Sequence, residues 1–164
     1  MPWLCPWPKE NRMENSILKP GVPVALCSDH AGYPVKEAVK RWLDAQGIAY
    51  KDFGTYNEDS CDYPDFAHPL AEAVEKGEYE FGIVICSTGN GICMTANKHQ
   101  GIRAALCWET KLAELARAHN NANVLGLPAN FISAPKALDI VRKFFQTDFE
   151  GGRHERRVSK IALH

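Results

Sequence analysis

The sequence has no long apolar run and almost no net charge, and these absences exclude several classes of protein. Its apolar runs fall far short of the roughly 18 residues that suggest a membrane-spanning helix. Lys plus Arg (19) and Asp plus Glu (20) nearly cancel, which leaves a formal net charge of −1. This balance gives no support to a nucleic-acid or membrane-surface binder. With 164 residues, 45% of them hydrophobic, the chain has the composition of a single soluble globular domain.

Common metal and nucleotide motifs are absent as well. None of the six cysteines forms a CxxC pair, which argues against a structural zinc site. The Gly-Lys-Ser/Thr ending of a Walker loop and the Gly-x-Gly-x-x-Gly fingerprint are both missing, so NTPase and dinucleotide interpretations are weak. Most of the cysteines lie in apolar runs, and we predict free thiols in a reducing compartment.

The N-terminal residues differ in composition from the rest of the chain. Residues 1–20 contain Trp3, Trp7 and several prolines, without the basic start and apolar stretch of a signal peptide. We expect residues 1–20 to form a poorly packed extension, residues 21–164 to form one domain, and the protein to be cytoplasmic.

After Pro20, short apolar runs alternate with segments of helical periodicity. The pattern predicts strands over residues 22–27, 48–53, 81–86, 102–107 and 123–127. It predicts helices over residues 33–46, 66–76, 92–98, 110–118 and 133–145, with a short last helix after the Gly151-Gly152 tail. Strands that are apolar on both faces are typical of a buried parallel sheet. We therefore predict an α/β sandwich with a five-stranded parallel sheet and helices on both faces.

Chemistry-bearing residues follow two of the predicted strands. Asp29 and His30 come after the first strand, and Cys86 with residues 87–91 after the third. Ligands of open α/β sheets bind beyond the carboxyl ends of the strands. The glycine-rich turn before a helix favours an anion. The same setting favours the thiolate of Cys86, as nucleophile or base, although a buried structural thiol is equally compatible with its position.

Three further polar residues are expected at the opposite edge of the sheet. His119 ends a helix that runs antiparallel to the strands, about 15 Å from the start of that helix. Arg153 and Arg157 follow the next helix, and a pair of guanidinium groups four residues apart suits a phosphate dianion. If these residues serve the Cys86 site, a second subunit must supply them. Otherwise His119 is a helix C-terminal histidine favoured by the dipole, and the basic run is solvated surface.

Seven short motifs occur together over residues 24–161. They are Ser28-Asp-His30, Asp62-Tyr-Pro64, Cys86-Ser-Thr-Gly-Asn-Gly-Ile92, Ala96-Asn-Lys98, Gly101-Ile-Arg-Ala104, His119-Asn120 with Asn123-Val124, and Gly151-Gly-Arg-His154 with Arg157-Val158. In this order they resemble the ribose-5-phosphate isomerase B family, which includes galactose-6-phosphate isomerase subunits. The resemblance implies a Rossmann-like three-layer sandwich without metal or cofactor. It also implies homodimers, or dimers of dimers, with active sites shared between subunits.

The implied reaction is the interconversion of ribose 5-phosphate and ribulose 5-phosphate through an enediolate. By resemblance, Cys86 is the base that moves the proton between C2 and C1. Thr88 and the loop amides stabilise the oxyanion. His119 of the partner subunit assists opening of the sugar ring, and Asp29 holds the ring oxygen or a hydroxyl.

Other positions are implied to bind the substrate. His30 shares the ring-opening task, Tyr63 and Asn120 contact sugar hydroxyls, and the two arginines hold the phosphate. The full set implied to bind substrate is His30, Tyr63, Ser87, Gly89, Asn90, Gly91, Asn120, Arg153 and Arg157.

One position departs from the family pattern. Members often carry another phosphate-binding Arg eleven residues after the histidine of the His-Asn pair, and here that residue is Asn130. Losing a fixed cation costs about 1.5–3 kcal/mol of hydrogen bonding to the phosphate. The same chemistry on a different aldose or aldose phosphate is therefore an alternative, and a non-catalytic sugar-phosphate-binding module is a second one.

Overall fold

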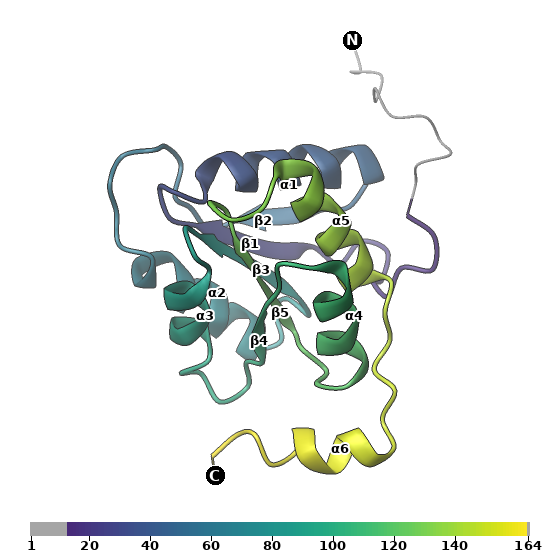
Figure 1. Ribbon diagram of the computed structural model, residues 1–164. Coiled ribbons are helices and arrows are strands. Elements are labelled where there is room, and N and C mark those ends of the chain that lie inside the picture. The colour runs from purple at the N-terminus through teal and green to yellow at the C-terminus, as the bar shows by residue number, and fades with distance from the viewer. Residues whose placement is uncertain (1–12, 164) are drawn as a thin grey trace.

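The computed structural model describes residues 13–163, and within them five parallel strands form one sheet in the order β2-β1-β3-β5-β4 (Figure 1). The strands are β1 Val24–Ser28, β2 Tyr50–Asp52, β3 Gly82–Cys86, β4 Ala104–Leu106 and β5 Val124–Pro128. The helices are α1 Tyr33–Gln46, α2 Pro64–Glu75, α3 Asn90–Ala96, α4 Thr110–Ala118, α5 Ala134–Phe145 and α6 Arg153–Val158. The predicted α/β architecture with a five-stranded parallel sheet is confirmed.

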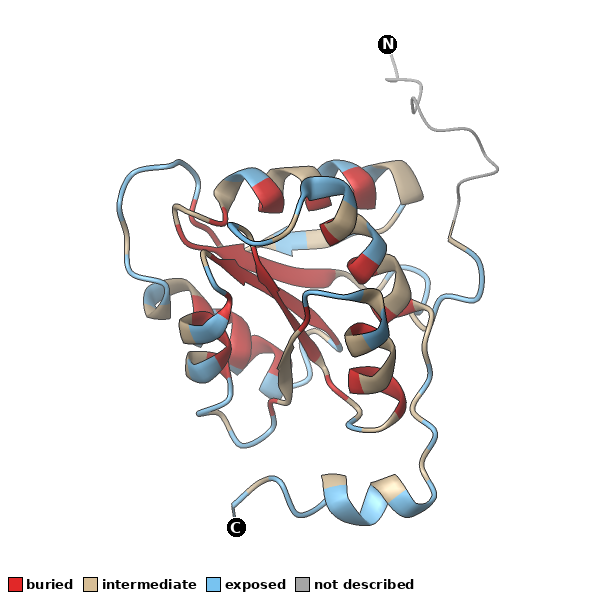
Figure 2. Cartoon of the chain, viewed as in Figure 1, coloured by how far each residue is buried: buried red, intermediate tan, exposed pale blue. Residues whose placement is uncertain are grey.

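The sheet lies between two helical layers, and its strands are the most buried part of the chain (Figure 2). Helices α1, α4 and α5 contribute to one hydrophobic cluster with the sheet, and α2 and α3 contribute to the other. Side chains alternate between the two faces because successive residues of a strand point to opposite sides.

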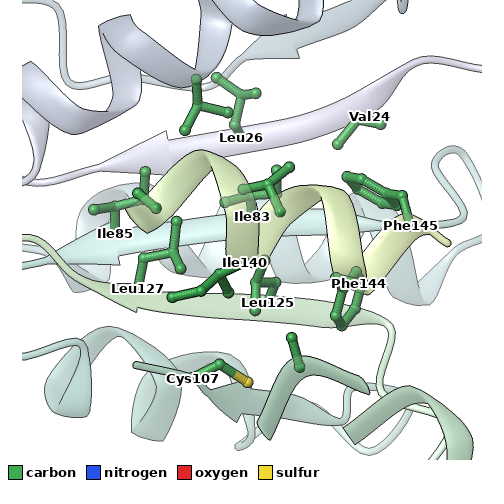
Figure 3. Close-up of a cluster of buried hydrophobic side chains, with 14 of the residues drawn as sticks. Val24, Leu26, Ile83, Ile85, Cys107, Leu125, Leu127, Ile140, Phe144 and Phe145 are labelled. Carbon is green, nitrogen blue, oxygen red and sulfur yellow. The ribbon is translucent and has the colours of Figure 1, made fainter. Parts of the chain in front are cut away.

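The two faces of the sheet carry side chains of different size. Bulky residues face α1, α4 and α5, where they pack with Ile140, Phe144 and Phe145 of α5 (Figure 3). These bulky strand residues are Leu26, Ile83, Ile85, Leu125 and Leu127. Toward α2 and α3 the strands present smaller groups, which are Ala25, Cys27, Val84, Cys86 and Val124. The smaller side chains let α3 lie close to the sheet. In sequence, α3 directly follows the loop after β3.

The predicted boundaries of α1 and α4 match the structure, whereas the two edge strands are shorter than predicted. β2 and β4 each span three residues. Each pairs with one neighbour only, β2 with β1 and β4 with β5. A strand at the edge of a sheet has no ladder on its outer side, so apolar residues flanking it can pack without extending the pairing. The predicted N-cap of α5 is confirmed, since the Ser133 hydroxyl accepts the Lys136 N–H at 3.2 Å.

Part of the N-terminal extension packs against the domain. Met13, Ile17 and Leu18 contact the cluster that includes α1 and α5. The Ile17 N–H donates to the carbonyl of Phe145 at 2.8 Å, and the Met13 N–H donates to Gln46 Oε1 at 2.6 Å. These contacts place apolar side chains of residues 13–18 on the α1–α5 face, whereas the division of the chain into a poorly packed extension and one domain stays a prediction. The rest of the extension, residues 1–12, lies outside the described residues.

In residues 13–163, no helix has both the length and the apolar character needed to cross a bilayer.

The connectivity of the sheet creates one favoured place for a ligand. β1 is followed in sequence by β2 on one side, and the chain then returns to place β3 on the other side of β1. The loops after β1 and β3 therefore leave the same edge of the sheet in opposite directions. Such a topological switch point is where open α/β sheets bind their ligands.

Candidate active site

The loop after β1 is anchored tightly to β3. Asp29 is buried, and its Oδ1 accepts the N–H of Gly32 at 2.9 Å. The N–H of Asp29 donates to the carbonyl of Ile85 at 3.2 Å. A Cβ on Gly32 would lie 2.4 Å from that same carbonyl oxygen, so only glycine lets α1 begin this close to β3. Because Ser28 pairs with Ile85, Asp29 follows β1 at the level at which Cys86 ends β3.

His30 is oriented by a contact that the sequence did not reveal. The N–H of Cys61 donates to His30 Nδ1 at 3.3 Å, and the Cys61 thiol lies 3.9 Å from the same nitrogen. Because Nδ1 accepts this hydrogen bond, the neutral ring carries its proton on Nε2. Cys61 directly precedes the Asp62-Tyr-Pro64 motif, which was the only signal of its involvement.

Cys86 ends β3 with 4% of its surface exposed. Its carbonyl accepts the N–H of Ala129 at 2.9 Å, and the carbonyl of Ser87 accepts the N–H of Asn130 at 3.0 Å. The side-chain amide of Asn130 also donates to Ser87 Oγ at 2.7 Å. Asn130, which replaces the expected arginine, therefore lies against the first residue of the glycine-rich loop.

The loop turns through Gly89 into helix α3. Gly89 has a φ of +75°, and a Cβ there would lie 2.3 Å from the side chain of Leu106, so both conformation and space require glycine. Thr88 Oγ1 accepts the N–H of Asn90 at 3.2 Å. The predicted helix after this turn is present, and it begins at Asn90, two residues earlier than predicted.

Tyr63 reaches the same loop from the start of α2. A Cβ on Gly91 would lie 2.4 Å from Tyr63 Cζ and 2.7 Å from its hydroxyl oxygen. The phenol ring therefore rests directly on Gly91, and about a third of Tyr63 (37%) stays exposed. The predicted site residues of the first group thus lie in the loops after β1 and β3 and just before α2, with Tyr63 in contact with the loop after β3. They are Asp29, His30, Tyr63, Cys86, Ser87, Thr88, Gly89, Asn90 and Gly91.

A network of buried and partly buried charges stabilises the turn after β2, which is bonded to the end of β1. The Lys36 side chain is fully buried, and Nζ donates to Asp52 Oδ1 at 2.7 Å and to the carbonyl of Thr55. Burial raises the pKa of Asp52, but hydrogen bonds from Lys36, the Gly54 N–H and Lys40 outweigh it, and the pKa lies below its usual value. Asp52 thus stays charged and holds the turn after β2.

That turn is joined to the end of β1. The N–H of Ser28 donates to the carbonyl of Gly54, and the N–H of Thr55 donates to the carbonyl of Ser28, both at 2.8 Å. Desolvation raises the pKa of the buried Cys27 thiol next to Ser28, so Cys27 stays neutral beneath the site. No pattern in the sequence predicted this network, because it joins side chains and backbone groups of α1, β2 and the turn after β2.

The second group of predicted site residues lies at the other edge of the sheet. His119 is the C-cap of α4, and its ring stacks on that of His154 with 4.2 Å between centroids. Arg153 and Arg157 belong to α6, which lies beside the end of α4 and away from the loops after β1 and β3 (Figure 1). The N–H of Leu163 donates to Gln100 after α3, so the tail stays on that side. His119, Asn120, Arg153 and Arg157 are not brought to Cys86 within one chain, as the direction of α4 predicts.

Exposed apolar side chains surround the glycine-rich loop. A cavity of about 360 Å³ is lined by Thr88, Asn90, Leu106, Trp108, Pro128 and Phe131. Trp108 and Phe131 are 52% and 72% exposed, and Met94 of α3 is 66% exposed. An apolar patch beside polar site residues is typical of a surface that another protein or a ligand covers.

The fold and the loops define a class of protein, an α/β sandwich whose ligand site lies at the switch point between β1 and β3. The chain belongs to the Ribose/Galactose Isomerase family, which matches residues 24–161. It is 44% identical to a probable ribose-5-phosphate isomerase B of Mycoplasma pneumoniae, over 87% of this chain and 94% of that protein. It is 40% identical to the ribose-5-phosphate isomerase B of Escherichia coli K12, over 84% of this chain and 93% of that protein.

Solved structures agree with this membership. The ribose 5-phosphate isomerase of Thermotoga maritima superposes with a TM-score of 0.85 at 49% identity, and the match covers 87% of this chain and 98% of that one. The ribose-5-phosphate isomerase B of Mycoplasma genitalium, solved with bound ribulose-5-phosphate, gives a TM-score of 0.82 at 42% identity, covering 86% and 94%.

Proposed function

We propose that this protein is an aldose–ketose isomerase that interconverts ribose 5-phosphate and ribulose 5-phosphate. The observation that carries the proposal is the similarity to ribose-5-phosphate isomerase B proteins over 84–87% of the chain. The positions of three predicted catalytic residues support it, since Asp29 lies in the loop after β1, Cys86 ends β3 and Thr88 lies in the loop after β3, all at the switch point.

The proposed mechanism moves one proton between neighbouring carbons. Cys86, as thiolate, takes the proton from C2 of the open-chain aldose, and the C2–H electrons form the C1=C2 bond of an enediolate with its charge on O1. Thr88 and the amides of residues 89–91 stabilise that charge. Cys86 then returns the proton to C1, while the hydroxyl proton on O2 moves to O1 and the ketone forms at C2. No external oxidant or reductant is consumed.

We propose that the site is completed by a second copy of the chain. His119 would assist ring opening, Asn120 would contact a hydroxyl, and Arg153 and Arg157 would hold the phosphate, all from the partner. Two features support a shared site: these side chains lie far from the chain's own Cys86, and no residue of α6 is buried. The exposed apolar side chains beside the glycine-rich loop offer a surface for that contact.

A second candidate is the same chemistry on a different aldose or aldose phosphate. Asn130 favours it, because a neutral amide bonded to Ser87 stands where a phosphate-binding arginine is expected. A guanidinium holds a phosphate with charge-assisted bidentate bonds that an amide does not make. Ribose 5-phosphate turnover distinguishes the two candidates, since a protein that needs the missing cation will prefer another sugar.

The first experiment measures ribose 5-phosphate turnover by the purified protein, with Cys86→Ala as the control. We expect turnover that falls by about 10²–10⁴-fold in Cys86→Ala, the usual contribution of a general base. Full activity in the variant would mean that Cys86 is not the base. A folded but inactive wild type would overturn the ribose 5-phosphate assignment, and a panel of other aldoses and their phosphates would follow.

Mixed dimers test the shared site. A dimer of one Cys86→Ala subunit and one His119→Ala subunit has one site with both residues intact and one site with neither. If the sites are shared, activity should return to about half of the wild-type value upon mixing. A verified mixed dimer without recovery would count against a shared site.

We further propose that the reaction needs no metal and that the protein works in the cytoplasm. The five cysteines within residues 13–163 are free thiols, which fits a reducing compartment. Activity that survives EDTA would agree with metal-independent chemistry, and activity lost to EDTA would contradict it.

A further inference from the structure

Three side chains at the edge opposite Cys86 form a compact group of metal-binding donors. His119, Glu150 and His154 offer ligand atoms that all lie within 4.8 Å of one another. Glu150 Oε2 lies 3.4 Å from His154 Nε2 and 3.9 Å from His119 Nε2. Within the described residues this is the only group of three or more His, Cys, Asp or Glu donors that is close enough to hold one ion.

The backbone holds the three donors together. The N–H of Glu150 donates to the carbonyl of Ala118 at 3.0 Å, which ties Glu150 to the end of the helix that carries His119. Gly151 and Gly152 both have positive φ values, +68° and +55°, and they reverse the chain between Glu150 and α6. This turn returns His154, four residues after Glu150, to the same carboxylate. The cluster therefore depends on local backbone structure and not on a chance meeting of long side chains.

The donor set suits zinc. Two imidazole nitrogens and one carboxylate oxygen are a known zinc set, with bonds of about 2.0–2.2 Å that put tetrahedral ligands about 3.3–3.6 Å apart. One of the observed separations, 3.4 Å, already has this length, and the other is 3.9 Å. The imidazole rings lie nearly parallel, at 14°, so they must turn for their lone pairs to converge. The exposure of the His119 and Glu150 side chains, 37% and 59%, leaves room for that adjustment.

We propose that His119, Glu150 and His154 form a binding site for Zn²⁺, with water in the open fourth position. The consequence for activity rests on the proposed function, in which His119 assists ring opening. Zinc bound to His119 Nε2 occupies the lone pair that would exchange protons with the sugar. Zinc therefore inhibits the isomerase and takes no part in its chemistry.

The alternative explanation of the cluster is a protonated histidine paired with Glu150 and no metal. Titration calorimetry with zinc chloride alone on the full chain decides between the two explanations. We expect binding whose affinity falls at least ~10–100-fold in His154→Gln, the loss usual even for residues that only support a ligand. Glu150→Gln serves as the second variant and should weaken zinc in the same way. Neither side chain has a role in the proposed reaction.

A matched control comes from the other histidine pair of the chain. His68 Nδ1 and His99 Nε2 lie 2.8 Å apart on the α2–α3 side, so this pair also attracts zinc if histidine pairs do so unspecifically. His99→Gln should leave the affinity of the His119 site unchanged. The Cys86→Ala protein should bind zinc as well as the wild type, which excludes the thiol as the ligand. Equal zinc affinity in His154→Gln and wild type would overturn the proposal, as would no binding at all.

Enzyme assays then test the consequence separately. Zinc should inhibit the wild type reversibly, with recovery on adding EDTA, and should inhibit His154→Gln only at concentrations at least ~10-fold higher. Binding without inhibition would keep the site and overturn its link to His119. A zinc-free protein without any isomerase activity would overturn the proposed function, and the calorimetry would still decide the zinc site.

Discussion

Gly126 in the middle of β5 sets how closely α3 approaches the sheet. Its replacement by alanine should lower the stability of the protein and disturb the geometry of the candidate site. A Cβ at this position would lie 2.1 Å from the Sγ of Cys93 on α3. Its next neighbours, the carbonyl oxygen of Ala105 and the Cα of Leu106, are at 3.5 and 3.6 Å, which are ordinary contacts. The added methyl group therefore meets one obstacle, the thiol.

The cost follows from how little room the thiol has. Cys93 is 6% exposed, so it cannot turn into solvent, and α3 must move or the side chain must leave its rotamer. Overpacking of this kind typically costs about 1–3 kcal/mol. The backbone of Gly126 does not have a positive φ, so Gly126→Ala adds no strain there and regains about 0.4–1 kcal/mol from the unfolded chain. We expect a net destabilisation of about 1–2 kcal/mol.

A compensating change isolates the cause. Cys93→Ala alone removes a buried sulfur and should cost about 1 kcal/mol. In the double variant the new methyl of residue 126 fills the space that the sulfur leaves, so the two costs should not add. The double variant should be more stable than Gly126→Ala alone by about 1 kcal/mol. Relative to simple addition of the two single-variant costs this is a coupling energy of about 2 kcal/mol, within the range for residues in contact.

Urea unfolding followed by far-UV circular dichroism measures all four proteins, with unchanged m-values as the control for two-state behaviour. Isomerase assays on the same samples should show reduced kcat/KM in Gly126→Ala, since α3 begins at the glycine-rich loop. A misplacement of about 1 Å can cost about 10²-fold in rate. If the stability costs of Gly126→Ala and Cys93→Ala simply add, the Cys93 thiol is not what excludes a side chain at position 126, and the reasoning fails.

Three further predictions concern the support of the site and one helix cap. Lys36→Met should destabilise the protein by about 3 kcal/mol, because Asp52 and the Thr55 carbonyl lose a buried partner. Lys40→Met removes a partly exposed partner of Asp52 and should cost less than about 1 kcal/mol. Equal costs of the two variants in urea unfolding would contradict the argument that burial makes the Lys36 pair the more important one. The pKa of Asp52 is lower in the folded protein than in the unfolded chain, where it is about 3.9, so the charged carboxylate stabilises the fold at any pH above about 3.9. This contribution is lost as the pH falls through the pKa of the folded protein. The stability advantage of wild type over Asp52→Asn should therefore shrink below about pH 4. An advantage that stays constant down to about pH 2 would refute it. Ser133→Ala should cost about 0.5–2 kcal/mol in thermal or urea unfolding, and Ser133→Asp should restore most of that loss; a neutral Ser133→Ala would mean that the cap contributes nothing.

The sequence determined the elements and the places where chemistry gathers. The periodicity of α1 and α4, the apolar strands and the Ser133 cap are local properties, and local properties are readable from neighbouring residues. The placement of Asp29 and Cys86 at one edge followed from the rule that parallel strands end together. The length and direction of α4 also predicted that His119 lies away from Cys86 in its own chain.

Contacts between distant segments were decided by the tertiary structure alone. Three features join residues that are far apart in sequence. They are the strand order β2-β1-β3-β5-β4, the contact of the Tyr63 ring with Gly91, and the hydrogen bond from Asn130 to Ser87. The same holds for the packing of Ile17 against α5, where an extension that reads as loose gains apolar contacts. The sequence predicts which loops lie at the same edge of the sheet, but not which of their side chains touch, because those contacts depend on the packing of whole layers. The stacked pair of His119 and His154 arises in this way, from a helix end and a glycine turn that only the fold brings together.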